Sequence, residues 1–258
     1  VGNVGLLGTL IIVTLSTAIT FLTSLSISAI ATDRVVRGGG AYYMISRSLG
    51  IESGGAVGIP LYFAQALSVA LYTLGFAESV VNVFPQLSQL YVALIVTVLI
   101  AGVALTSADI AIKVQYIIMG AIALSLLSFF LGKPLEPTEI ELWGAPDRVS
   151  EPFWQVFAVF FPAVTGIMAG VNMSGDLKNP TKSIPIGTLA AVGTGYVIYM
   201  ILPIVMAMRA EATTLLAEPL IMKKIALWGP AILLGVWGAT LSSALGSILG
   251  APRILQAL

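Results

Sequence analysis

The 258-residue sequence contains no cysteine and no histidine. The absence of cysteine excludes disulfide bonds, thiolate metal sites and cysteine nucleophiles. The absence of histidine removes the usual general base of serine hydrolases and the commonest neutral metal ligand. These absences argue against enzymatic chemistry, and the sequence is interpreted as that of a protein that is not an enzyme.

Charge is also scarce. Charged residues make up 9% of the chain, whereas a soluble domain carries roughly 25%. Hydrophobic residues reach 58%, and the mean hydropathy is +1.01. Several runs approach the ~20 apolar residues that a helix needs to cross a bilayer. The predicted fold class is an all-α polytopic membrane protein with about seven transmembrane helices. Their expected positions are about 5–30, 56–83, 91–106, 114–131, 153–175, 185–207 and 229–251.

The few charges predict a topology. Arg34, Arg37 and Arg47 gather in one loop, which should be cytoplasmic because basic loops are retained inside. The acidic, proline-rich stretch 132–151 is expected outside, and it separates residues 1–131 from residues 152–258. The N-terminal end should then lie outside and the C-terminal end inside. Short helices are expected over 41–49, at the membrane interface, and over 209–227, outside.

The stretch 161–175, FPAVTGIMAGVNMSG, does not have the pattern of an ordinary helix. Pro162 removes a backbone donor, and each glycine weakens a helix interior by ~1 kcal/mol. A helix broken near Thr165–Gly166 is predicted, with carbonyl groups available to a cation and N–H groups available to an anion. The alternative is a continuous helix in which Gly166 and Gly170 form a close-packing face.

Two other spans carry polar faces. Thr17, Thr20, Ser24 and Ser28 share one helical face, which is interpreted as helix packing. The second span places Tyr72 near its middle on a polar stripe, so the phenol is expected to face the bundle. Because Glu78 is the only acid within a predicted span, neutral oxygens are the main polar groups. Such oxygens suit monovalent cations, and the pattern indicates transport of ions or zwitterions.

Three blocks carry a family resemblance: RGGGAYYMISRSLG with LYTLGFAESV, then FFPAVTGIMAGVNMSGDLKNPTKSIPIGT, then ATLSSALGSILGAPRILQAL. Together they resemble the cation–chloride cotransporters of the amino acid–polyamine–organocation superfamily. The resemblance implies a fragment of a core built from two inverted five-helix repeats. Residues 1–131 would hold helices two to five of the first repeat, and residues 152–258 helices six to eight of the second, with 132–151 as an extracellular loop. The first helix and those from the ninth onward would lie outside this sequence.

The resemblance also implies roles for individual residues and a function, the secondary active, electroneutral cotransport of sodium and potassium with chloride. The implied potassium ligands are Tyr72, Pro162 and Thr165; the implied chloride ligands are Gly166, Ile167 and Met168; the implied sodium ligands are Ala239, Ser242 and Ser243. The paired serines favour a sodium-coupled branch, and the tyrosine favours potassium transport. The alternative is an amino acid permease of the same superfamily, in which the broken helix would bind a carboxylate and an amine.

The expected partners follow from the same interpretation. The protein should need no cofactor and no metal beyond the transported ions sodium, potassium and chloride. It should contact membrane lipid and no nucleic acid, and a homodimer would form through parts outside this sequence. The expected location is the plasma membrane.

Overall fold

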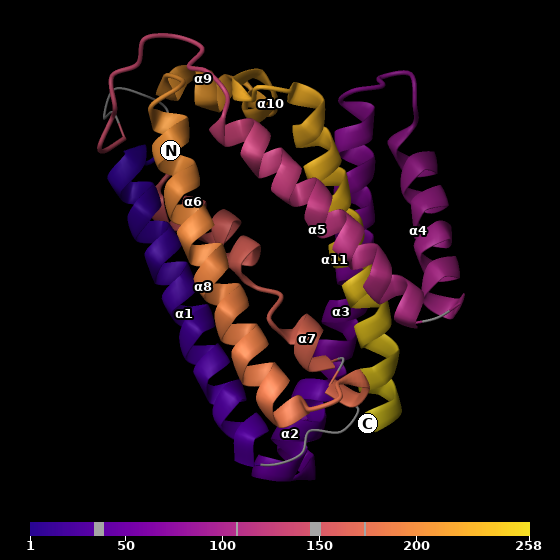
Figure 1. Ribbon diagram of the computed structural model, residues 1–258. Helices are drawn as coiled ribbons and strands as arrows, with labels where there is room; N and C mark the ends of the chain where they lie inside the picture. The colour runs from indigo at the N-terminus through magenta and orange to yellow at the C-terminus, as the bar shows by residue number, and fades with distance from the viewer. Residues whose placement is uncertain (34–38, 107, 145–150, 173) are drawn as a thin grey trace. The chain divides into compact units, whose positions relative to one another are not determined.

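The computed structural model describes residues 1–33, 39–106, 108–144, 151–172 and 174–258, without the side chains of 106, 108–112 and 176. Helices are the only regular elements in these ranges (Figure 1). The elements are α1 (Gly5–Asp33), α2 (Gly40–Leu49), α3 (Ile51–Val81), α4 (Gln89–Thr106), α5 (Ala108–Phe130), α6 (Phe153–Phe160), η1 (Phe161–Val164), α7 (Met168–Asn172), η2 (Ser174–Asp176), α8 (Pro180–Ala207), α9 (Ala212–Ala217), α10 (Ile221–Ile225) and α11 (Gly229–Ala257).

The apolar helices confirm the predicted fold class. Six segments in the described residues are long and apolar enough to cross a membrane: Gly5–Asp33, Ile51–Val81, Lys113–Phe130, Phe153–Asn172, Pro180–Ala207 and Gly229–Ala257. A shorter apolar helix, Gln89–Leu105, corresponds to the third expected span. Helix α8 begins earlier than expected because Pro180 occupies its first turn, where the missing N–H costs no hydrogen bond.

The chain forms two compact units. The first unit comprises Val1–Val35, Phe129–Gly170 and Asn179–Gly229, and the second comprises Val36–Ser128, Val171–Lys178 and Pro230–Leu258. The backbone passes from the first to the second within α7. The sequence predicts one repeat in residues 1–131 and another in residues 152–258. The two compact units do not test whether these segments are repeats, so the division stays a prediction.

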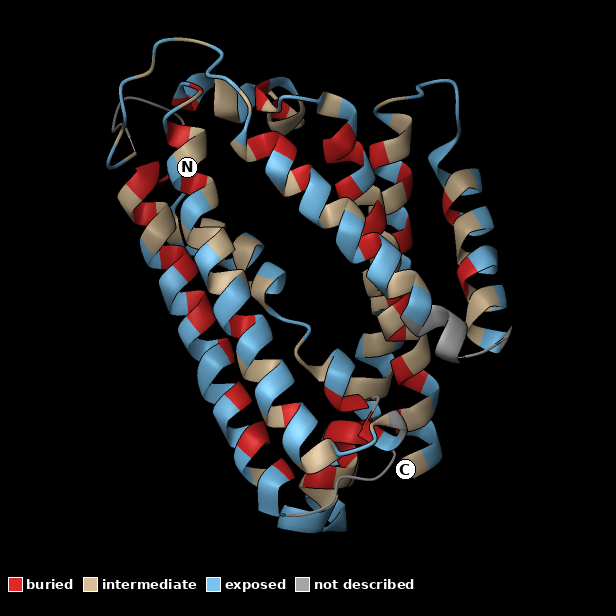
Figure 2. Ribbon diagram, viewed as in Figure 1, coloured by how far each residue is buried: buried red, intermediate tan, exposed pale blue. Residues whose placement is uncertain are grey.

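Helices α1 and α8 run side by side in the first unit (Figure 1). Buried residues recur along α1 (Figure 2), and they include the predicted hydroxyl face. Ser24 and Ser28 donate to the carbonyl groups of Thr20 and Ser24, at 2.8 and 2.7 Å. Ser24 and Ser28 thus pair their hydroxyls within the helix, whereas the buried hydroxyl of Thr17 has no partner among the described residues. All four residues of the face are buried, which agrees with the packing interpretation.

The start of α1 is completed by the long loop that follows α5. The first N–H groups of a helix have no partner within the helix. Here the N–H groups of Leu6 and Leu7 donate to the carbonyl oxygens of Glu141 and Leu142, at 2.8 and 2.9 Å. Gly5 has a φ of +70°, and a Cβ at this position would lie 2.6 Å from the backbone of Trp143. Glycine is therefore required where the loop meets the helix.

Arg209, which follows α8, anchors the other end of this loop. Its guanidinium donates to the carbonyl oxygens of Phe129 and Phe130 at the end of α5. The carbonyl of Arg209 accepts the N–H of Leu135 at 2.9 Å. A single side chain thus satisfies two of the carbonyl groups that a helix C-terminus leaves unpaired.

The prediction of one helix over 209–227 is wrong, because the segment forms two short helices, α9 and α10. Glu218 lies between them with φ −116° and ψ 97°. It precedes Pro219, and the proline ring disfavours helical backbone in the residue before it.

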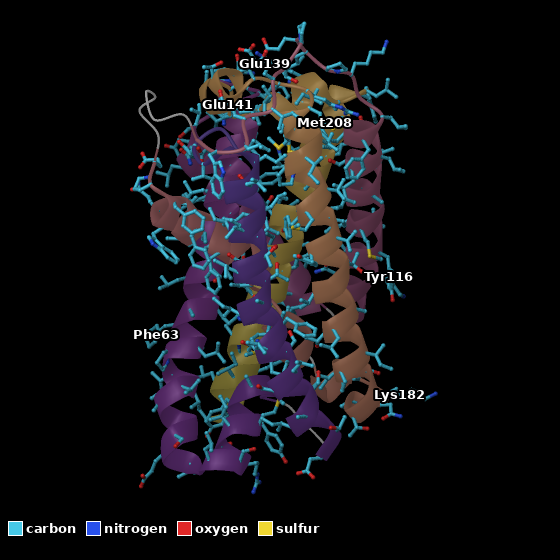
Figure 3. The ribbon with its side chains drawn as sticks, turned by 90° about the vertical axis from the view of Figure 1, so that its left-hand side faces the viewer. Phe63, Tyr116, Glu139, Glu141, Lys182 and Met208 are labelled. Atoms are coloured by element: carbon cyan, nitrogen blue, oxygen red, sulfur yellow. The ribbon has the colours of Figure 1, made fainter. Side chains whose placement is uncertain are left out.

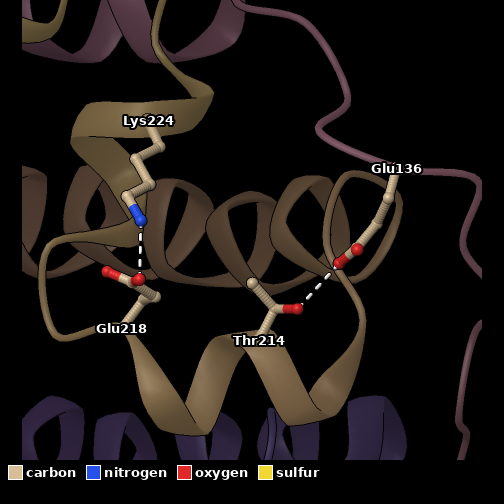
Figure 4. Close-up of polar contacts among 4 residues, drawn as sticks. All are labelled: Glu136, Thr214, Glu218 and Lys224. Atoms are coloured by element: carbon tan, nitrogen blue, oxygen red, sulfur yellow. Dashed lines mark hydrogen bonds and ion pairs between the residues drawn. The ribbon is translucent and has the colours of Figure 1, made fainter.

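A carboxylate outside the spans joins the loop to α9 (Figure 4). Glu136 accepts the backbone N–H of Glu211 at 3.0 Å and the hydroxyl of Thr214 at 2.8 Å. These two donors, the backbone group first, lower the pKa of Glu136. The ion pair of Lys224 with Glu218, at 2.6 Å, is substantially exposed and contributes little stability.

The second unit contains the predicted short helix, α2, and two glycines that accommodate one buried amide. Asn172 is 1% exposed. A Cβ on Gly40 would lie 2.4 Å from its Oδ1 atom, and a Cβ on Gly250 would lie 3.2 Å from its Nδ2 atom. Gly40 also has a φ of +52°, in the region that favours glycine. The end of α7, the start of α2 and α11 therefore pack closely because both glycines lack side chains.

Candidate functional site

The predicted break in the fifth span is confirmed. Helix α6 ends at Phe160 and continues as a single 3-10 turn, and helical backbone resumes only at Met168. Thr165 is extended, with φ −83° and ψ −172°, and Gly166 has a φ of +96°. Among the described residues other than its two chain neighbours, no atom lies within 4 Å of a Cβ built on Gly166, so glycine is favoured here by conformation and not by space. The alternative of a continuous helix through Gly166 is wrong.

The break places two predicted cation ligands in contact. The carbonyl oxygen of Pro162 accepts the N–H of Thr165 at 3.2 Å and its hydroxyl at 2.7 Å. A hydroxyl that donates its proton keeps its lone pairs for another partner. Both residues are exposed in the first unit, and the Thr165 hydroxyl keeps lone pairs that a cation can approach.

The predicted anion ligands follow directly in sequence. In the described part of the chain, no acceptor is found for the N–H groups of Gly166, Ile167 and Met168, whereas the next N–H, of Ala169, donates to the Gly166 carbonyl at 3.1 Å. Unpaired amides are costly at membrane depth unless a cavity or another group satisfies them. Three consecutive donors therefore suit an anion or water.

A cavity of about 270 Å³ adjoins the break inside the first unit. Its walls come from α1, the broken segment and α8, and its polar lining consists of Thr17, Thr20, Thr165, Tyr196 and Tyr199. The hydroxyl of Tyr199 donates to the carbonyl oxygen of Ala163 at 3.0 Å. Tyr199 therefore fixes the backbone just ahead of the break.

In the second unit, Tyr72 lies on α3 and packs against a buried cluster of Ile100, Ala244 and Leu245. Its side chain is half-buried. The contact agrees with the prediction that Tyr72 faces other helices. The ring is held by α4 and α11, and the hydroxyl is its only polar atom.

The predicted sodium ligands Ala239, Ser242 and Ser243 lie half-buried on α11 in the second unit. Ser242 has a partner on α5. Its hydroxyl donates to Oε1 of Gln115, and Nε2 of Gln115 donates to the Ser242 carbonyl at 3.3 Å. Gln115 and Tyr199 were not predicted from the sequence. The available signal was a glutamine and a phenol within predicted spans, which did not indicate a partner.

The structure thus brings Pro162, Thr165 and the three amides together in the first unit, and places Tyr72 with the α11 residues in the second. Apolar spanning helices, one of them interrupted at exposed polar groups, are typical of a polytopic membrane transport protein.

The comparisons with known proteins give the family. The family model described as amino acid permease matches residues 1–258, and the chain belongs to this family. It is 35% identical over 320 residues to mouse solute carrier family 12 member 1, covering 100% of this chain and 29% of that protein. It is also 35% identical over 318 residues to human solute carrier family 12 member 2, covering 100% of this chain and 26% of that protein. Mouse solute carrier family 12 member 8 is 35% identical over 274 residues, and the chain spans 39% of its length.

These relatives confirm the superfamily resemblance seen in the three sequence blocks. The chain spans only 29% and 26% of the lengths of the first two.

Proposed function

We propose that this protein carries out secondary active, electroneutral cotransport of sodium and potassium with chloride. The observation that carries the proposal is the break at Thr165–Gly166, where the exposed residues Pro162 and Thr165 precede three N–H groups that have no acceptor among the described residues. A cation and an anion bound on successive residues would stabilise each other. Solute carrier relatives over the whole chain support a transport role.

The proposed ligands are those that the sequence predicts. For potassium, Pro162 and Thr165 of the first unit would provide carbonyl and hydroxyl oxygens, and Tyr72 of the second unit would provide a phenol oxygen. The N–H groups of Gly166–Met168 would bind chloride. For sodium, α11 contributes Ala239 through its backbone and Ser242 and Ser243 through their hydroxyls. Neutral oxygens of this kind replace the hydration shell of an alkali cation without holding it too tightly to leave.

The second candidate function is amino acid transport, which is the function that the description of the family model names. The amides of Gly166–Met168 would bind a carboxylate equally well. Among the described residues, none that lines the adjacent cavity has an acidic side chain to pair with an amine. For that reason we favour chloride as the anion.

Tracer uptake by the full-length protein that carries this sequence, reconstituted in liposomes, distinguishes the two functions. We expect chloride uptake that needs both sodium and potassium and that produces no current. Labelled amino acid uptake without ion-dependent chloride uptake would instead establish the permease function.

We further propose the plasma membrane as the location, with the N-terminal end of this sequence outside and its C-terminal end inside. In the first unit, Glu139 and Glu141 lie at one end of α8 and Lys182 at the other (Figure 3). This separation supports opposite sides of the membrane for the acidic loop and the start of α8. Of the basic loop, Arg34 and Arg37 lie outside the described residues, and Arg47 is exposed at the end of α2.

Single cysteines test this orientation, because the chain has none of its own. In intact cells, an impermeant thiol reagent should label Glu139→Cys and leave Lys182→Cys unlabelled until the cells are permeabilised. The reverse pattern would invert the topology, and equal labelling of both positions would refute the assignment.

The other proposed properties are independent of orientation. The protein would work without a bound cofactor, in contact with lipid and not with nucleic acid. It would form a homodimer through parts outside this sequence.

A further inference from the structure

In the second unit, the side-chain amide of Gln115 forms two hydrogen bonds with one residue, Ser242. Gln115 of α5 donates from Nε2 to the carbonyl oxygen of Ser242 at 3.3 Å, and its Oε1 accepts the Ser242 hydroxyl. The two residues lie 127 positions apart in the sequence and are both half-buried. The contact is therefore a tertiary one between two membrane helices.

The direction of these bonds determines what the serine can offer to a cation. A hydroxyl has one proton and two acceptor lone pairs. When the proton is donated to Gln115, the lone pairs are directed elsewhere and are free to bind a positive ion. Without that acceptor the hydroxyl could rotate and donate to a neighbouring helix carbonyl, as Ser24 and Ser28 do on α1.

The second bond acts on the same residue. The carbonyl of Ser242 lies within α11, and a carbonyl oxygen can accept a second hydrogen bond besides its helical one. Donation by Nε2 fixes the amide, so its Oε1 atom stays directed at the hydroxyl. Because both ends of the amide are paired, the arrangement has little freedom to reorient.

We propose that Gln115 is a positioning residue for sodium binding, orienting the Ser242 hydroxyl so that its lone pairs face the ion. The inference rests on the proposed function, since it assigns a role toward the predicted sodium ligand. It adds α5 to the elements that determine sodium affinity. A purely structural role, in which Gln115 only holds α5 against α11, makes a different prediction.

The test measures the sodium concentration that half-saturates chloride uptake by the full-length protein, at matched surface amounts. Gln115→Leu removes the acceptor, and we expect this concentration to rise about five- to tenfold, the usual consequence of losing one hydrogen bond. Maximal uptake at saturating sodium should be retained. Gln115→Glu keeps an acceptor oxygen and should keep the half-saturating concentration at or below the wild-type value.

Ser125→Ala is the matched control. Ser125 is a buried hydroxyl residue on α5 that lies close to Gly235 of α11. Its replacement alters the same helix pair away from Ser242 and should leave the sodium response unchanged. If Gln115→Leu does not reach the membrane, Gln115→Met removes the same polar groups in a side chain of similar length.

The outcomes separate this inference from the proposed function. If wild-type uptake does not depend on sodium, both are refuted. If wild-type uptake depends on sodium but Gln115→Leu or Gln115→Met lowers only the maximal rate or surface amount, the structural role holds and the inference fails. It also fails if Gln115→Glu shifts the sodium response as far as Gln115→Leu.

Discussion

Replacement of Ser243 by alanine is expected to raise the sodium requirement for chloride uptake by about 10- to 150-fold. Losing one charge-assisted contact costs ~1.5–3 kcal/mol, and each 1.4 kcal/mol is a factor of ten. Ser243 is half-buried on α11, where alanine fits the helix without new contacts. The fold and surface amount should therefore be unaffected, and the loss should appear in sodium titrations of tracer uptake by the full-length protein.

Ser247→Ala provides the control for this effect. Ser247 is a buried serine one turn further along the same helix, outside the predicted ligands. Its replacement should leave the sodium response unchanged. If Ser243→Ala keeps the wild-type sodium response at equal surface amounts, the assignment of Ser243 as a sodium ligand is wrong.

Replacement of Tyr72 by phenylalanine is expected to weaken potassium dependence by a similar factor, about tenfold or more, and to spare sodium. The ring packs against Ile100, Ala244 and Leu245, and phenylalanine preserves that contact. Only the hydroxyl is removed, so stability should change little. Potassium titrations of chloride uptake at saturating sodium measure the effect.

Tyr62→Phe is the matched control, because Tyr62 lies on the same helix and contacts Phe63 at a ring separation of 5.4 Å. This change should not alter the potassium response. Wild-type potassium dependence in Tyr72→Phe would remove Tyr72 from the proposed ligands. Labelled amino acid uptake in place of ion-dependent chloride uptake would favour the permease function for the whole protein.

The features predicted correctly from the sequence are those with a local physical cause. Long apolar runs determine the spans, because a bilayer requires them. Pro162 and Gly166 indicate the break, since one removes a donor and the other tolerates a φ of +96°. The two short helices α9 and α10 could also have been predicted, because Pro219 disfavours helical backbone at the residue before it.

The features that the sequence did not reveal depend on single polar residues that are far apart in the chain. Gln115 is 127 positions from Ser242, and Tyr199 is 36 positions from Ala163. Neither pair leaves a periodic pattern, because one hydrogen bond between two helices constrains only two positions. The enclosure of Asn172 by Gly40 and Gly250 is likewise visible only once α2, the last residues of α7 and α11 are placed within the second unit.

The hydrogen bonds that complete α1 have a consequence for the order in which the protein is made. The N–H groups of Leu6 and Leu7 find their acceptors at Glu141 and Leu142. During synthesis, α3, α4 and α5 must all emerge before those acceptors exist. The first turn of α1 therefore stays incomplete through the insertion of three later helices, and its final structure forms only after the loop beyond α5 has been translated.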